Sequence, residues 1–377
     1  MRSELILYCL IMLVSFEAAA QQKFEFDGQV STVASYNPDN SLDLLVAGRY
    51  IPELNYEIQL DSNRLFDIEL SSNISGSLSS LPFDTFTHTS KISPYRMWAR
   101  YSGSQFELRA GLQKIDFGSA TLLRPLQWFN EIDPRDPLQL TNGVYGLLGK
   151  YYFLNNTNIW VWGLYGNENQ RGFDALPSNQ NAPEFGGRIQ KSTPKGEIAL
   201  SYHNRKADAS EFLMNSDYSS ISENKIAFDG RWDNVVGFWT ELSHSFKDEN
   251  IGILTNQSLA NVGIDYTFGI GNGLNVIAEH LILTYNETDF NFKNTGNVTA
   301  STLNYPLGLF DNLLSVVYYD WAGDNFAFFL NYQHSFRTVT GYVMAFYNPE
   351  TQQGITQNDF TNSFSGPGIR VMFVYNH

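Results

Sequence analysis

The sequence predicts an all-β fold, a transmembrane antiparallel β-barrel of about 16–18 strands, with 18 favoured, and an inward-folded constriction loop. Three observations predict it. Short segments alternate apolar with polar residues, the connections between them alternate between short and long, and aromatic residues make up 15% of the chain. A period of two gives a strand two different faces, and each strand of a membrane barrel turns one face to lipid.

Residues 1–20 have the pattern of a signal peptide. Arg2 supplies a positive charge, the apolar stretch that follows is too short to span a bilayer, and alanines precede the expected cleavage site. Cys9, the one cysteine of the sequence, lies in this segment, so the mature chain would carry no thiol, which suits an oxidising compartment. We expect residues 21–377 to form one barrel domain in the outer membrane of a Gram-negative bacterium.

The rest of the chain has no apolar run long enough for a transmembrane helix, so strands would have to make any membrane crossing. The formal net charge of −15 argues against nucleic acid as a partner, because phosphate binding requires a basic face.

Alternation is clearest in segments that carry charge or glycine on their polar face. In 106–113, Phe106 and Leu108 fall on one face, whereas Glu107 and Arg109 fall on the other. Polar faces of this kind suit a water-filled interior better than the dry core of a β-sandwich. Similar segments are 197–203, 225–232, 261–268, 326–333 and 369–376.

The connections between these segments alternate strictly in length, as in a bacterial barrel with tight periplasmic turns and long outer loops. Near the C-terminus, a tight link at 335–338 and a long link at 348–366 keep this parity only if residues 286–311 contain one more strand. We place that strand at 302–307, although it includes Pro306. Short links are expected at 102–105, 154–158, 192–196, 233–234 and 269–272, and long links at 118–143, 166–183, 206–221 and 246–258.

Aromatic residues cluster near the expected strand ends, where membrane barrels carry girdles at both interfaces. A soluble aromatic core or a sugar-binding platform is the alternative explanation. The clusters are Tyr95, Trp98 and Tyr101; Trp160, Trp162 and Tyr165; and Tyr318, Tyr319 and Trp321.

The long link at 118–143, after the fifth strand, is the most distinctive stretch. Its leucines and aromatic residues need burial, and Pro125, Pro134 and Pro137 stiffen it. Loops of this length are usually functional or disordered. An apolar, rigid outer loop would pack inward and narrow the channel that a barrel of this size leaves.

The expected lumen wall beneath this loop is charged. Facing arginine and carboxylate groups would create a transverse field that sorts solutes by charge and dipole. The alternative is that these groups form salt-bridge ladders that only satisfy one another, and Glu184 and Gln190 would belong to the same wall. The candidate pore-lining or constriction residues are Arg96, Arg100, Glu107, Arg109, Gln113, Arg124, Asp133, Arg135, Asp136 and Arg188.

Residues 108–149 resemble porin-type outer-membrane proteins of Bacteroidetes-like bacteria, and are more distantly similar to alginate-export and phosphate-selective porins. The resemblance rests on an R-x-G-x-Q strand that runs into Phe-Gly and then into a loop with Asp-Pro: Arg109, Gly111, Gln113, Phe117, Gly118, Asp133 and Pro134. It implies a substrate-permeable barrel and transfers no substrate. The C-terminus departs from the classical pattern, because His377 rather than an aromatic residue ends the chain.

Catalytic and metal-binding patterns are missing from the sequence. The six histidines lack the H-x-x-x-H or H-E-x-x-H spacing of zinc sites. A barrel hydrolase would have to use His203 with Ser201 or His244 with Ser243, and such neighbours on a strand are generic. We expect no enzyme activity, no metal and no cofactor.

These features favour passive, moderately selective diffusion of small hydrophilic solutes or an anionic oligosaccharide. The partners would be outer-membrane lipid, the solutes and, during biogenesis, the barrel-assembly machinery. Three alternatives stay open: a barrel enzyme, a plugged barrel that serves as an adhesion or assembly scaffold, and a soluble secreted β-protein that binds glycans.

Overall fold

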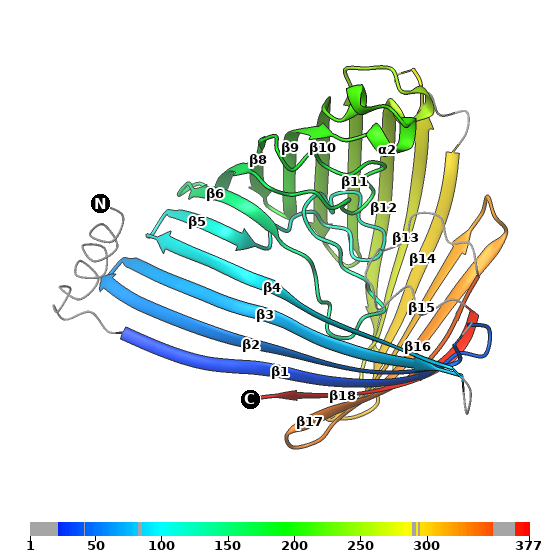
Figure 1. The fold of residues 1–377 in the computed structure, drawn as a ribbon. Helices are drawn as coiled ribbons and strands as arrows, with labels where there is room; N and C mark the ends of the chain where they lie inside the picture. The colour runs from blue at the N-terminus through cyan, green and yellow to red at the C-terminus, as the bar shows by residue number, and fades with distance from the viewer. Residues whose placement is uncertain (1–21, 41, 82–84, 289–291, 293–294, 350–365) are drawn as a thin grey trace.

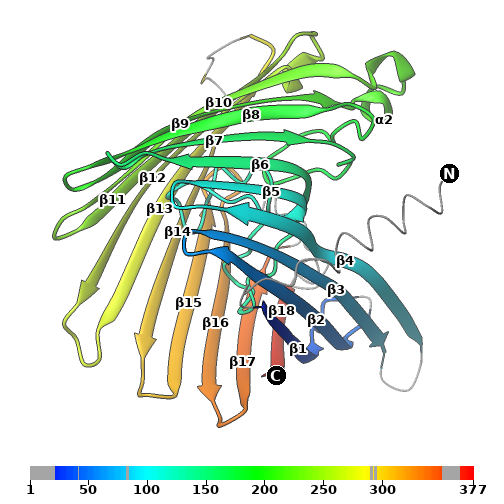
Figure 2. The same ribbon diagram turned by 90° about the vertical axis from the view of Figure 1, so that its left-hand side faces the viewer.

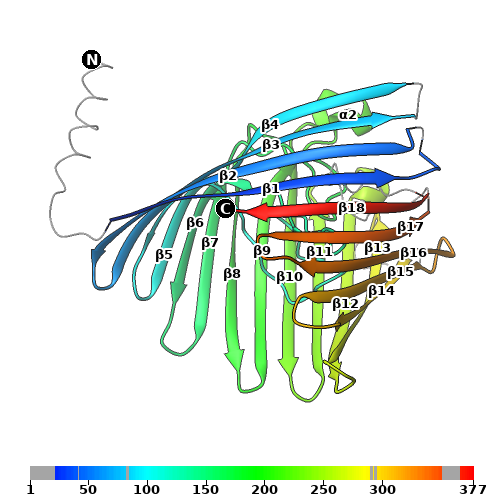
Figure 3. The ribbon, with the colours of Figure 1, turned by 90° about the horizontal axis from the view of Figure 1, so that it is seen from below.

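The computed structural model describes residues 22–40, 42–81, 85–288, 292, 295–349 and 366–377, and the expected signal peptide lies outside them. These residues form one closed antiparallel barrel of 18 strands (Figure 1). Each strand pairs with the next, and β1 pairs with β18 so that Gln29 lies opposite Asn376 (Figure 3). The predicted fold class and the favoured strand number are therefore confirmed.

The strands differ in length, and short helices occur in two connections. None of the helices in the described part of the chain is long and apolar enough to cross a membrane. The elements are β1 (Gln22–Tyr36), β2 (Leu44–Asp61), β3 (Arg64–Ser80), β4 (Phe86–Ser102), β5 (Phe106–Gln113), β6 (Val144–Tyr152), β7 (Thr157–Leu164), β8 (Glu184–Thr193), β9 (Gly196–Ala207), α2 (Ser210–Leu213), η1 (Ser216–Tyr218), β10 (Ile221–Asp233), β11 (Gly237–Lys247), η2 (Gly252–Leu254), β12 (Asn256–Phe268), β13 (Leu274–Asn286), β14 (Thr295–Pro306), β15 (Asp311–Asp320), β16 (Asn325–Ser335), β17 (Val339–Asn348) and β18 (Gly366–Asn376).

The alternation of connection lengths is confirmed from β5 to β15, whereas the links at 81–85 and 321–324 are short where long ones were predicted. Tight turns join β2 to β3, β4 to β5 and each later even-numbered strand to its successor at one end of the barrel, which also holds Gln22 and Asn376 (Figure 2). We call this end the short-turn end. The strand required by parity is β14, which begins at Thr295, seven residues before the predicted start, and ends on Pro306. At the end of a strand the missing amide of proline costs little pairing. The opposite end carries the longer connections, although 321–324 is short.

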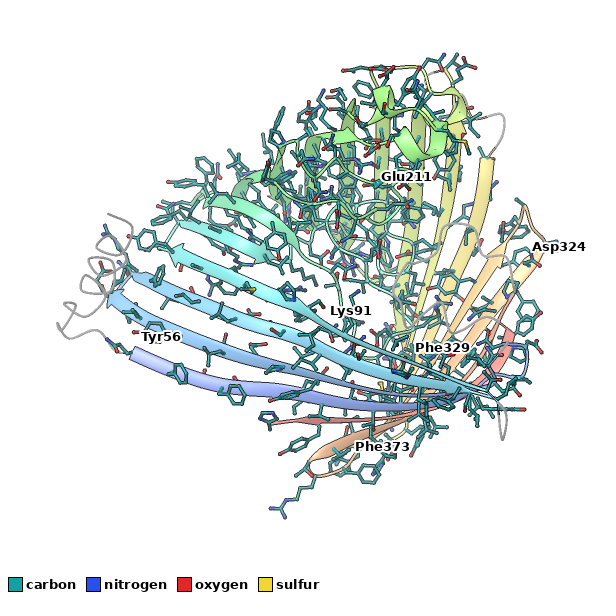
Figure 4. All side chains as sticks on the ribbon, viewed as in Figure 1. Tyr56, Lys91, Glu211, Asp324, Phe329 and Phe373 are labelled. Atoms are coloured by element: carbon teal, nitrogen blue, oxygen red, sulfur yellow. The ribbon has the colours of Figure 1, made fainter. Side chains whose placement is uncertain are left out.

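Burial is inverted relative to a soluble protein. On β11, the Glu241 side chain is fully buried whereas Leu242 is 45% exposed, and on β12 Asn261 and Val262 show the same contrast. Figure 4 shows Phe329 on the inner side of the wall and Phe373 on the outer side, and they are 1% and 48% exposed. Apolar side chains therefore cover the outside of the ring, as a bilayer requires.

The predicted aromatic girdles are wrong in part. Trp162 and Tyr318 are buried inside the barrel, and Trp160 lies opposite Lys150 on the inner face. Residues two apart share a face of a strand, so Trp160 and Trp162 both point inward. Tyr165 and Trp321 are exposed, as a girdle requires.

The strands are shortest at β5 to β7, which have eight or nine residues each. β4 pairs with β3 along its length but with β5 only from Met97 to Ser102. Pro94 lacks an amide, and a bulge follows it before Arg96. On β5, Gly111 has a positive φ of 123°, and a Cβ there would collide with the Met97 carbonyl oxygen. Because the pair separates here, the chain after β5 is free to leave the wall.

The inner wall is not polar all the way round. The side of the lumen formed by β15 to β18 is largely apolar, and it packs against residues of the long connections, namely Leu122, Leu123, Leu138 and Phe173. The wall residues include Val316, Phe329, Met344, Phe346 and Met372. The expected water-filled face is therefore limited to the remaining strands.

Candidate functional site in the barrel interior

The connection between β5 and β6 folds into the barrel, as predicted (Figure 1). We call residues 114–143 the inner loop. It starts four residues earlier than predicted, because β5 ends at Gln113. Phe117, Trp128 and Phe129 are buried against Trp162 of β7, and the Phe117 and Trp162 rings stack at 5.8 Å between centroids. The apolar content of the loop, which suggested burial, is thus explained by this cluster.

Two wall carboxylates hold the first part of the inner loop by its main chain. Glu241 of β11 and Glu279 of β13 each accept three backbone N–H groups, and a Cβ at Gly118 would collide with Glu241. The donors are Ser119, Ala120 and Leu126 at 2.5–3.3 Å, and Thr121, Leu122 and Leu123 at 2.6–3.1 Å.

The later part of the loop reaches β15 and β17, across the ring from β5, where the loop begins. Arg135 binds Asp133 at 3.0 Å and donates to the Asn348 side chain at the end of β17, 3.1 Å away. Its guanidinium lies 6.0 Å from the Tyr318 ring of β15. Near the loop end, Arg96 of β4 donates to the Thr141 carbonyl at 2.9 Å. The inner loop therefore crosses the lumen from one side of the ring to the other.

Most of the predicted site residues position this loop or the wall. Arg124 binds Asp116 at 2.6 Å; burial alone would raise the pKa of Asp116, but Arg124 outweighs it and the pKa is lowered. Asp136 accepts the amides of Leu138 and Leu140, and burial raises its pKa. Gln113 is fully buried and donates to backbone carbonyls of β5 and β6.

Arg188, which was predicted to line the pore, is buried in the wall. Its side chain is 2% exposed, and Asp229 on β10 binds it at two points, 2.5 and 2.8 Å away. The guanidinium also lies 5.0 Å from the Phe117 ring. This pair matches the alternative of a salt-bridge ladder, in which wall charges satisfy one another.

A solvated group of charges remains on β4 to β6. Arg100 and Arg109 lie directly opposite each other; Arg100 binds Asp67 at 2.7 Å and Arg109 binds Glu107 at 2.9 Å. Lys150 lies 3.8 Å from Glu107. We call Arg100, Arg109 and Lys150 the basic group. Their side chains are 16–28% exposed, more than Arg188.

Sequence reasoning missed a second inward connection. The link at 165–183, here called the second loop, carries Asp174, which binds Arg205 of β9 at 2.9 Å and also Lys225 of β10. Arg171 of the same loop binds Glu184 at 2.6 Å. The length of the second loop was predicted. Its inward position was not, because Arg205 and Lys225 lie on later strands and the sequence near Asp174 does not indicate that it binds them.

The His–Ser neighbours considered for a hydrolase have other partners. His203 lies 3.1 Å from Glu184 and accepts from the Trp162 indole, while Ser201 accepts from Arg188. His244 Nδ1 lies 2.8 Å from the hydroxyl of Ser258. Within the described ranges, no group of three or more His, Cys, Asp or Glu side chains is placed to hold a metal ion.

The two loops touch inside the barrel. The Gly172 amide donates to Glu131 of the inner loop at 3.0 Å, and Arg171 lies 5.7 Å from the Phe129 ring. Burial raises the pKa of Glu131 from 4.5 to about 7, although the Gly172 hydrogen bond opposes this. Undocking of the second loop would expose Glu131 to water and return its pKa toward 4.5. Protonation of Glu131 would therefore favour the docked state below 4.5, and this contribution is lost as pH rises through about 7.

We therefore expect the second loop to be held more tightly at pH 5.5 than at pH 8.5. A spin label on an Asn169→Cys variant reports this motion cleanly, because Cys9 is the one native cysteine and lies in the expected signal peptide. Label mobility should increase at the higher pH, and Glu131→Gln should remove the change. The same pH dependence in Glu131→Gln would contradict this role.

Comparison with known proteins places the fold. No protein-family model and no curated protein matches the sequence. The structure is similar to OccAB1 of Acinetobacter baumannii, with a TM-score of 0.55, 10% identity and coverage of 96% of this chain and 99% of that chain. OccK5 (OpdH) of Pseudomonas aeruginosa has a TM-score of 0.55, 11% identity and coverage of 94% and 98%. An anion-selective porin from Comamonas acidovorans has a TM-score of 0.51, 12% identity and coverage of 95% and 100%. At these identities the likeness shows a shared barrel fold.

Proposed function

We propose that this protein is an outer-membrane channel for passive diffusion of small hydrophilic solutes. The observation that carries the proposal is the combination of an apolar outer surface with charged side chains that keep solvent contact inside the ring. Residues 1–20 would be the signal peptide and 21–377 the barrel domain. Outer-membrane lipid and the barrel-assembly machinery of a Gram-negative cell would be its partners.

The solute path would run between the inner loop and the wall formed by β1 to β6. Elsewhere the wall is occupied: the loop binds Glu241 and Glu279 on one side and packs against the apolar strands on the other. Glu107 and the basic group on β4 to β6 keep partial exposure, so they would line the path. Arg96, Gln113, Arg124, Asp133, Arg135 and Asp136 would set its width by holding the loop, and Arg188 by fixing the wall behind it.

The similarity to a porin and the resemblance of residues 108–149 to Bacteroidetes-type porins support this proposal. The more distant resemblance to alginate-export and phosphate-selective porins favours anionic solutes, as do the arginines. Arg100, Arg109 and Arg188 each form an ion pair with a carboxylate, however, so the number of arginines is a poor guide to anion selectivity. No catalytic step is part of the proposal.

Conductance of the purified protein in a planar bilayer tests the proposal. Discrete current steps that persist in both voltage polarities are expected, together with block by solutes that enter the path. A correctly folded barrel without conductance would overturn the proposal, and would favour a plugged scaffold because the inner loop contacts so many strands.

Arg109→Glu should shift the reversal potential toward that of the cation. The change replaces a positive with a negative charge beside Glu107 on the proposed path. Arg337→Glu is the matched control, because Arg337 is exposed on the tight turn between β16 and β17. Equal reversal potentials in Arg109→Glu and the parent protein would count against this placement of Arg109.

A further inference from the structure

We propose that the pathway selects cations and small cationic solutes over anions, an inference that rests on the proposed channel function. The geometry that carries it is a set of carboxylates on the inner face of β1 to β3, near the short-turn end. These residues, called the acidic face below, are Glu25, Asp27, Glu53, Glu57, Asp67 and Glu69.

Strand register places the acidic face inside the barrel. Asp27 lies opposite Glu53, Glu53 opposite Ser71, and Ser71 opposite Arg96. Arg96 donates to the Thr141 carbonyl of the inner loop, which fixes its face as the inner one. Because residues directly opposite in a sheet point to the same side, the whole row faces the lumen.

The remaining carboxylates follow from the same register. Every second side chain of a strand points to the same face. Glu25, two residues from Asp27, and Glu57, four residues from Glu53, therefore also face inward. Glu57 lies opposite Asp67, and Asp67 opposite Arg100. Glu69 lies opposite Trp98, whose ring is 4.7 Å from the Arg109 guanidinium inside the lumen.

Two of the six carboxylates of the acidic face form an ion pair with a base. Lys23 binds Glu25 at 2.6 Å, and Arg100 binds Asp67 at 2.7 Å. No ion pair within the described residues joins Asp27, Glu53, Glu57 or Glu69 to a base. Asp27 and Glu57 are exposed, and Glu53 and Glu69 are half-buried.

The positive charges of the adjacent wall are paired with carboxylates and keep only partial exposure. Arg109 and Lys150 share Glu107, and they rest on the indoles of Trp98 and Trp160 at 4.7 and 4.1 Å. Arg96 is 7% exposed and its side chain donates to backbone carbonyls. At the short-turn end the accessible charge is therefore mostly negative. Two more bases on the inner face, Arg49 and Lys91, lie opposite Ser75, farther from that end.

A buried polar group points into the same row. The Ser71 hydroxyl, in a residue 3% exposed, has no hydrogen-bond partner among the described residues. It lies between Glu53 and Arg96 in register, and its oxygen can accept a hydrogen bond from water or from an ammonium group. An oxygen-rich row of this kind suits a hydrated cation or an amine.

Low-dielectric walls concentrate the field of these carboxylates and raise the local concentration of counter-ions. Mobile salt screens this field over about 10 Å at 0.1 M and about 30 Å at 0.01 M. Cation preference should therefore rise as the salt concentration falls, which distinguishes a charged lining from a size filter.

The test is the reversal potential of the reconstituted protein under a tenfold KCl gradient. We expect potassium to be at least about twofold more permeant than chloride, and the ratio to fall toward one in the Asp27→Asn/Glu53→Gln/Glu57→Gln variant. The control variant Glu211→Gln/Asp217→Asn/Glu249→Gln removes the same number of charges from exposed positions at the opposite end. It should keep the parent ratio.

The outcomes separate the two proposals. A conducting channel that prefers chloride, or whose cation preference survives the triple substitution, overturns the inference and leaves the channel function intact. A folded barrel that does not conduct overturns both. Folding of each variant is checked by the shift in gel mobility between unheated and boiled samples.

Discussion

Replacement of residues 119–140 by a short glycine–serine linker is expected to raise single-channel conductance several-fold. The inner loop crosses the lumen between the Glu241 and Glu279 carboxylates and Asn348 of β17, and a barrel of 16–18 strands without such a segment leaves an aqueous channel. Conductance at fixed salt in planar bilayers, compared with the parent protein, is the measurement.

A milder variant guards against misfolding of the excised barrel. Glu241→Gln/Glu279→Gln keeps the loop, but in each side chain one of the two oxygens that accept backbone amides becomes an amide nitrogen, which cannot accept. Current fluctuations should increase while the mean conductance changes less than after excision. Conductance that stays at the parent value in the folded, excised barrel would show that the loop does not limit the path.

Asp229→Ala is expected to lower the free energy of unfolding by about 3–5 kcal/mol, because it leaves the Arg188 charge buried with its carboxylate partner removed. Both side chains of this pair are 2% exposed. Urea unfolding in lipid vesicles, followed by tryptophan fluorescence, measures the loss.

Asp67→Ala is the matched control for this loss. Arg100, its partner, is 28% exposed, so water can replace the carboxylate and the cost should stay below about 1 kcal/mol. The double variant Arg188→Leu/Asp229→Leu should recover much of the stability, because it removes both buried charges. Equal losses for Asp229→Ala and the double variant would show that packing, rather than the orphaned charge, sets the cost.

The barrel itself could be predicted because its rules are local. Period-two alternation and the parity of connection lengths depend on neighbouring residues, and both survive in the structure: Ile369 and Phe373 point outward on β18 while Arg370 and Met372 are buried. The strand at β14 followed from parity alone. Its start was missed because the residues before 302 show no clear alternation.

The interior could be predicted less well, because its contacts join distant parts of the chain. Glu241 and Glu279 hold a loop more than a hundred residues earlier, and nothing near either residue marks it as an anchor. Asp174 finds its partners in the same way, on strands that come later in the chain. The apolar inner side of β15 to β18 was missed because strands packed on both faces lose the contrast that alternation detects.

The first part of the inner loop is held in place through its backbone, so its position there depends little on which side chains it carries. Glu241 and Glu279 accept hydrogen bonds from backbone N–H groups, which every residue except proline supplies. The side chain of Thr121, which is exposed, can therefore be exchanged while the backbone of the segment stays bound. Exposed positions of this kind let protein engineers change the chemistry of the aperture without moving the loop.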